Sequence, residues 1–395
     1  MFPQLIIFTL LGIVAGTFTG LIPGIHINLI GAFLISLSAS FLSTTEPTFL
    51  VVFIVAMAIT HTFLDFIPSI FLGCPDTDTE LSVLPGHELL KKGAGYEAVI
   101  LTCYGSFAAV FILIIITLPS IWLISKTYDF IRISIPYLLI AISIILILLE
   151  RKKFPALFVF LLTGFLGWCV LNYEPLKEPL LPLLTGLFGG SMLVMSIKNK
   201  IQIPKQKITK PRTQILKPLL GALLAAPLCS FLPGLGSGQA AIIGNIISRT
   251  NRKGFLVLLG ATNTLVMGFS FISLYVVSKT RTGAAVAIQK IIGQLTPETL
   301  ILILLVTLIT GIISFFLTTQ LAKFFSQKIG RINYTIISIT TLTLLAILVL
   351  TISGLTGLAV LTASTFTGIY CISLKVRRTN MMGCLLIPTI LLYLF

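Results

Sequence analysis

The chain has 395 residues, of which 56% are hydrophobic and only 10% are charged. This composition excludes an ordinary water-soluble domain, and recurring apolar runs of about 18 residues or more indicate helices that span a bilayer. The formal net charge of +15 makes nucleic acid a candidate partner, but most basic residues lie in short clusters between apolar runs, so the positive-inside rule accounts for them without such a partner.

The first expected element is a helical hairpin over residues 4–42, which the dipeptide Pro23-Gly24 interrupts. Proline lacks an N–H and disfavours continuation of the preceding helix, and glycine permits a tight turn. No short basic leader precedes this apolar run, so we expect no signal peptide. The hairpin therefore opens a membrane domain directly.

Five predicted spans follow the hairpin and complete a first repeat over residues 1–196: 48–72, 97–119, 133–149, 154–172 and 180–196. The polar, Lys-rich stretch 197–217 is then the one clear linker, and its charge predicts a cytoplasmic position. Counting crossings outward from this linker places both the N-terminus and the C-terminus outside the cell.

The second half, residues 218–395, repeats the pattern with a hairpin over 218–248 and spans over 254–278, 298–319, 332–352, 354–374 and 381–395. Pro233-Gly234 interrupts this second hairpin, 210 residues after Pro23-Gly24. An odd number of crossings inverts the second half relative to the first. The predicted fold is an all-α integral membrane protein of two inverted-topology repeats, each a re-entrant or broken helical hairpin plus about five transmembrane helices.

Broken helices at corresponding places of two inverted halves indicate the binding site of a secondary transporter. A helix that starts after each break has N–H groups without an internal partner, which favour carboxylate or phosphate. The predicted tip residues are Pro23, Gly24, His26, Asn28, Pro233, Gly234, Gly236, Ser237, Gly238 and Gln239. The alternative is a pair of ordinary turns between full-length spans.

A ladder of small residues precedes each break, with Gly12, Gly16 and Gly20 in the first half. Ala222, Ala226 and Ser230 occupy the same register in the second. Such ladders also let helices approach closely, so packing is a second explanation for them.

Polar residues within the predicted spans are further candidates for the substrate site. Thr60, Thr62, Thr262, Asn263 and Thr264 occur at matching places in the two halves and are predicted to line the substrate site. A threonine can instead satisfy the backbone of its own helix.

His61 and Asp65 lie one helical turn apart on one face and are predicted to couple transport to protons or sodium. The alternative is a static hydrogen-bonded pair.

Other chemistry has little support. The acidic loop Gly73–Glu80 lacks the spacing of an EF-hand, and the six cysteines are scattered without a CxxC pair. No HExxH, GxSxG or Walker A motif is present. We therefore expect no enzyme activity, no metal site and no cofactor, apart from sodium or a proton as the coupling ion.

The segments LIPGIHINLIGAFL at 21–34 and FLPGLGSGQAAIIGNII at 231–247 resemble the large membrane subunit of tripartite tricarboxylate transporters, in particular its shorter archaeal members. The resemblance extends over 67–99 and 260–288. It implies uptake of small carboxylates driven by an ion gradient, with a small membrane subunit and an extracytoplasmic binding protein as partners. The family's first tip reads roughly PGLGP, whereas this chain has Pro23-Gly24-Ile25-His26-Ile27.

The predicted function is secondary active transport of a di- or tricarboxylate-like anion across the cytoplasmic membrane by alternating access. The alternative is a transporter of polyprenyl phosphates, whose headgroups suit the same helix ends; an intramembrane enzyme is a third hypothesis. The sequence is also compatible with a homodimer.

Overall fold

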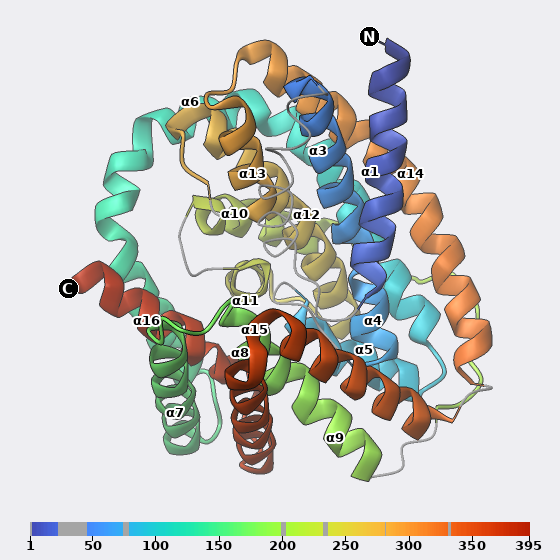
Figure 1. Cartoon of the computed structure of the whole chain (residues 1–395), viewed down its shortest axis with the longest axis vertical. Coiled ribbons are helices and arrows are strands. Elements are labelled where there is room, and N and C mark those ends of the chain that lie inside the picture. Colours follow the sequence, from blue (N-terminus) through green and yellow to red (C-terminus); the bar gives the residue numbers. More distant parts are fainter. Residues whose placement is uncertain are drawn as a thin grey trace.

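The computed structural model describes residues 2–22, 46–73, 79–198, 203–231, 236–280, 282–330 and 333–395 (Figure 1). Within these ranges the chain is helical and contains no strand. Eight of the described helical segments are long and apolar enough to cross a membrane. The predicted class, an all-α membrane protein, is confirmed.

The first half begins with α1 and α3, and α3 is followed directly by the short helix α4. Pro68 explains the junction between α3 and α4, because its ring clashes with the carbonyl of Leu64, four residues earlier, and it provides no N–H to that oxygen. The helices of this half are α1 (Phe2–Leu21), α3 (Pro47–Leu64), α4 (Phe66–Phe71), η1 (Glu80–Ser82), α5 (Val83–Lys91), α6 (Gly95–Leu148), α7 (Lys153–Leu171), α8 (Leu180–Leu184), the π-helix η2 (Thr185–Gly190) and α9 (Ser191–Lys198).

The second half follows the linker and has a similar order of helices. The side chains of Asn251, Thr282, Thr296 and Asn333 cap four of them by accepting a hydrogen bond from a first-turn N–H. These helices are α10 (Leu216–Phe231), α11 (Ser237–Ser248), α12 (Arg252–Val277), α13 (Gly283–Ile292), α14 (Pro297–Ile329), α15 (Tyr334–Ser373), η3 (Arg378–Met382) and α16 (Gly383–Leu394).

Two elements join spans that the sequence separates. The predicted spans 97–119 and 133–149 both lie in α6, whose 54 residues would measure about 80 Å if straight, far more than one crossing needs. Pro119 and Pro136 lie inside it, and the ribbon bends between the top and the left side of Figure 1. α15 contains the spans predicted at 332–352 and 354–374, and Gly354 interrupts it with a φ of 68° and a ψ of −164°.

The two halves are interlocked around α3 and α12, the most deeply buried of the described spanning segments. α3 packs against α1 from its own half and against α13 and α14 from the other half. α12 packs in the same way against α10 from its own half and against α5 and α6 from the other. This exchange is compatible with two inverted repeats.

Small residues allow the closest of these contacts. A Cβ on Gly16 would lie 2.5 Å from the Met57 carbonyl oxygen of α3, and a Cβ on Gly260 of α12 would lie 1.9 Å from the Thr102 carbonyl oxygen of α6. In the same α6–α12 contact, a Cβ on Gly105 of α6 would clash with the Val257 carbonyl oxygen of α12. The ladder that contains Gly16 therefore serves close helix packing.

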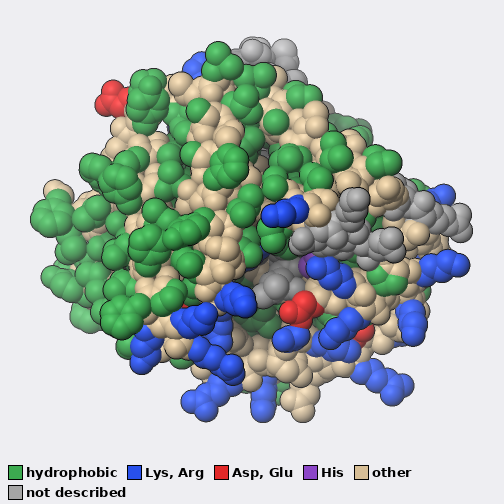
Figure 2. Space-filling view, turned by 90° about the horizontal axis from the view of Figure 1, so that it is seen from below, with side chains coloured by type: hydrophobic (Ala, Val, Ile, Leu, Met, Phe, Trp, Pro, Cys, Tyr) green, Lys and Arg blue, Asp and Glu red, His purple; other side chains and the backbone are tan. Residues whose placement is uncertain are grey.

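The basic clusters converge on one face. Glu88, Glu97 and Glu150 of the first half pair with three basic residues of the second half, namely Arg252, Lys253 and Arg377. The linker joins the same face, since Lys207 N–H donates to Gly93 O and Gly330 lies close to Lys205. Figure 2 shows Lys and Arg gathered over one part of the lower face, beside a largely apolar surface. This separation of charge fits a protein with one basic membrane surface.

Candidate functional site

A buried polar junction lies where α3 meets α12. Asn263 Nδ2 donates to Asp65 Oδ2 at 2.7 Å and approaches Thr62 O at 3.4 Å. Asp65 and Asn263 are only 3% and 4% exposed. A polar or charged group at membrane depth is costly unless it is hydrogen-bonded, so this junction holds the two most deeply buried spanning helices in a defined register.

The matched threonines divide into two roles. Thr62 Oγ1 and Thr264 Oγ1 are 3.1 Å apart and join α3 to α12 directly, while Ser314 of α14 donates to Thr60 Oγ1. Thr262 Oγ1 instead donates to carbonyls of its own helix. Thr62 and Thr264 occupy matching places in the two predicted repeats, and their contact is compatible with two inverted halves.

His61 and Asp65 reach toward different helices. His61 Nδ1 is 3.1 Å from Thr19 Oγ1 of α1, and Asp65 Oδ2 accepts from Asn263 of α12. The α3 helix thus connects α1 to α12 through these two titratable side chains. The contacts of His61 and Asp65 give each residue a partner on another helix.

The predicted tips are described only in part. Pro23, Gly24, His26 and Asn28, together with Pro233 and Gly234, lie outside the described residues. At the second tip, α11 begins at Ser237, and the Gly236 N–H donates to Gln239 Oε1 at 2.6 Å. One of the amides predicted to be open therefore already has an acceptor.

Gln239 contributes a second feature of this tip. Its Nε2 atom is buried and has no hydrogen-bond partner in the described part of the chain. The amides at the start of α11, including that of Gly238, have no acceptor within the helix because they precede its first complete turn. A buried amide donor at a helix N-terminus is suited to an oxyanion.

The sequence did not single out two further buried hydrogen bonds that resemble each other. Ser69 and Thr79 are 2.6 Å apart between their hydroxyls, and Ser270 and Thr282 are 2.7 Å apart. Each pair ties the segment after α4 or α12 back to the preceding helix. The signal in the sequence was a serine at a similar distance after each Thr-x-Thr motif.

Among the described residues, no group of three or more His, Cys, Asp and Glu side chains could hold a metal ion. The five described cysteines form no disulfide with one another, namely Cys103, Cys169, Cys229, Cys371 and Cys384. Residues 74–78 of the acidic loop lie outside the described residues. The groups that the structure brings together at the α3–α12 junction are the Asp65 carboxylate, the Asn263 amide and the hydroxyls of Thr62 and Thr264.

Comparison with known proteins places this arrangement in context. Residues 6–383 match the tripartite tricarboxylate transporter TctA family. An uncharacterized protein of Methanocaldococcus jannaschii is 31% identical over 354 residues, which cover 87% of this chain and 88% of the relative. No solved structure matches the chain significantly.

Proposed function

Because the chain belongs to the tripartite tricarboxylate transporter TctA family, we propose that it is a secondary active transporter of a small organic anion of the di- or tricarboxylate type. It would work in the cytoplasmic membrane by alternating access and use a proton or sodium gradient. The family is one of transporters, and it works with a small membrane subunit and an extracytoplasmic binding protein. We propose the same kinds of partner for this chain.

The observation that carries the proposal is the buried hydrogen bond between Asp65 and Asn263. Ionisable residues inside a membrane domain mark ion and substrate pathways. Asp65 lies between α3 and α12, each of which packs against helices of both halves. A rocking movement of one half against the other would therefore change the surroundings of Asp65. Asp65 and His61 are the proposed coupling residues.

The substrate would bind at the N-terminus of α11 and at the α3–α12 junction. Gly236, Ser237, Gly238 and Gln239 would provide donors to a carboxylate, with Asn263 as a further donor. Thr60, Thr62, Thr262 and Thr264 would complete the wall. The residues of both Pro-Gly breaks, Pro23, Gly24, His26, Asn28, Pro233 and Gly234, stay part of this proposed site.

The experiment compares Asn263→Leu and Gly236→Leu with the matched control Asn172→Leu, whose asparagine is exposed at the end of α7. Citrate-dependent thermal stabilisation of the purified protein and uptake of labelled citrate are measured, the latter with the two partner proteins present. We expect both signals from the wild type and the control, and neither from the two site variants. Wild-type uptake by Asn263→Leu would overturn the site, and stabilisation by polyprenyl phosphate alone would overturn the substrate class.

A further inference from the structure

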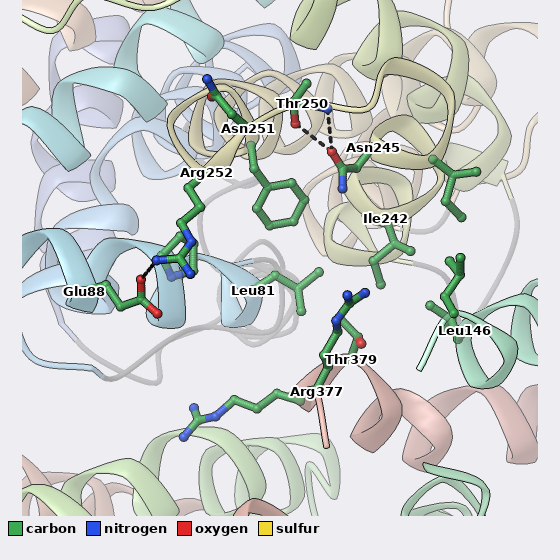
Figure 3. Close-up of a pocket in the computed structure, with 15 residues that line it drawn as sticks. Leu81, Glu88, Leu146, Ile242, Asn245, Thr250, Asn251, Arg252, Arg377 and Thr379 are labelled. Atoms are coloured by element: carbon green, nitrogen blue, oxygen red, sulfur yellow. Dashed lines mark hydrogen bonds and ion pairs between the residues drawn. The ribbon is translucent and has the colours of Figure 1, made fainter. Parts of the chain in front are cut away.

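A cavity lies on the basic face, beside the start of α12 and the end of α6. It has a volume of about 360 Å³ and is enclosed by α5, the end of α6, α11, the start of α12 and η3 (Figure 3). Its polar lining includes Arg252, Arg377, Arg378 and Asn245. Three guanidinium groups around one cavity make it a candidate site for an anion.

Arg378 differs from its two neighbours. Arg252 pairs with Glu88 and Arg377 pairs with Glu150, and both arginine side chains are largely exposed. The Nη1 atom of Arg378 is buried and has no hydrogen-bond partner among the described residues. Burial lowers the pKa of Arg378 to about 10, so the group is still charged at neutral pH. Arg378 as a whole is half-buried, but a guanidinium nitrogen removed from water without a partner has a free-energy cost, which a bound oxyanion would offset.

The other wall of the cavity is apolar. Leu146, Ile242 and Phe255 line it, and Leu149 and Ile246 lie at its edge with exposed fractions of 51% and 41%. Leu149 caps the end of α6 directly after its apolar segment Pro136–Leu148, so the edge of the cavity continues the apolar surface of that helix. A small, fully hydrated anion does not need such a wall, whereas a lipid presents a phosphate and a chain together.

We propose that this cavity binds the headgroup of an anionic phospholipid, with the phosphate on Arg378 and an acyl chain along Leu149 and Ile246. Guanidinium groups bind phosphate through paired hydrogen bonds. Basic pockets between membrane helices are suited to lipid headgroups. The cavity is lined by α11 residues beyond Gln239, from Ile242 onward, and this proposal does not depend on the proposed substrate site.

The first test measures binding of short-chain phosphatidylglycerol to the detergent-purified full chain, with phosphatidylcholine and inorganic phosphate as comparison ligands. We expect phosphatidylglycerol to bind best and Arg378→Gln to weaken it about tenfold or more, the usual effect of losing a charged hydrogen bond. The matched control Arg212→Gln, in the exposed linker, should bind as the wild type does. Unchanged binding by Arg378→Gln would overturn the site.

The other ligands test the source of the anion. Equal stabilisation by inorganic phosphate would replace the lipid with a free oxyanion and overturn the proposal. Displacement of the lipid by citrate would place the cavity on the transport path and also overturn it.

A second variant tests the same cavity if Arg378→Gln fails to fold. Asn245 Oδ1 accepts hydrogen bonds from Thr250 N and Oγ1, and Asn245→Asp retains an oxygen that can accept both while adding a negative charge to the cavity. We expect this variant to melt at a higher temperature than the wild type without lipid and to bind phosphatidylglycerol more weakly. A lower melting temperature with unchanged lipid binding would mean that Arg378 already has a counter-ion, and the proposal would fail.

Discussion

Asp65 has a packing contact in the structure and is also the residue that we propose for ion coupling. Its carboxylate is buried in a helix long and apolar enough to span a bilayer, and the Asn263 amide of the other half of the chain donates to it. An amide partner stabilises the carboxylate without neutralising its charge. We propose that this carboxylate exchanges a proton or attracts a sodium ion during transport.

The substitution Asp65→Asn tests this proposal. It keeps an oxygen that can accept from Asn263 Nδ2 but removes the charge, so we expect the protein to fold and to bind citrate while losing uptake driven by a proton or sodium gradient. Gradient-driven uptake into proteoliposomes, with the partner proteins added, is the measurement. Glu174→Gln in the exposed turn after α7 is the control, and gradient-driven uptake by Asp65→Asn equal to that of the wild type would exclude Asp65 from coupling.

His87 in the short surface helix α5 provides a second residue-scale test. Burial, helped by the charges of Lys91 and Arg378, lowers the pKa of His87 from 6.5 to about 4, although the contact with Ile70 O acts in the opposite direction. Between pH 6.5 and 4 the unfolded chain binds more protons at this site than the folded chain. Stability is therefore complete above pH 6.5 and decreases as the pH falls toward 4, by about 3 kcal/mol in total.

The variant His87→Asn removes this titration and retains a donor for Ile70 O. We expect its melting temperature to depend less steeply on pH than that of the wild type between pH 6.5 and 4. Differential scanning fluorimetry across this range measures the difference. Parallel curves for the two proteins would show that another group causes the acid sensitivity.

At the scale of elements, close glycine contacts fix how the spanning helices cross. Gly105 and Gly260 bring the backbones of α6 and α12 together, and Gly167 and Gly383 do the same for α7 and α16. Each contact joins a helix of one half to a helix of the other. Because the obstructing atoms belong to the backbone, the neighbours have little freedom to move aside.

Gly260→Ala should therefore destabilise the protein although alanine favours a helix. Its Cβ would lie 1.9 Å from Thr102 O, and overpacking of this kind typically costs about 1–3 kcal/mol. Gly330→Ala is the control, because its nearest atom would be 3.3 Å away. Thermal unfolding in detergent should show a clear decrease for Gly260→Ala and a small change for Gly330→Ala; equal effects would contradict the close crossing.

At the scale of the whole molecule, the ion pairs and the linker contacts bring the basic clusters to one face, which we propose to be cytoplasmic. Single cysteines at Lys207 and Glu174, in a background without the native cysteines, test this topology. We expect an impermeant thiol reagent added to intact cells to label Glu174→Cys and to leave Lys207→Cys unlabelled. Both should react after permeabilisation, and labelling of Lys207→Cys in intact cells would reverse the assignment.

Much of the architecture could be predicted because the apolar runs and the basic clusters that indicate it are local features of the sequence. The all-α membrane class, the glycine ladder and the family resemblance all depend on short segments, while the two interrupted hairpins stay a prediction. Continuous α6 could not be foreseen, since Pro119 and Pro136 usually end helices and here only lie within one.

The hydrogen-bond partners of the candidate site residues could not be predicted from the sequence either. Asp65 and Asn263 could each be selected as polar residues at membrane depth, but their hydrogen bond depends on how α3 crosses α12. Arg378 was counted only as one of the basic residues that set orientation. The Nη1 atom of Arg378 is buried because helices from distant parts of the chain surround it, and a local sequence pattern does not predict that.

The exchange of contacts between the halves has a consequence for biogenesis. Asn263 is 198 positions after its partner Asp65, so at roughly 5–20 residues per second it leaves the ribosome on the order of 10–40 s later. During that interval α3 must wait in or near the bilayer with a carboxylate that lacks its final amide donor. The insertion machinery, and not the finished transporter, experiences the most exposed form of this helix.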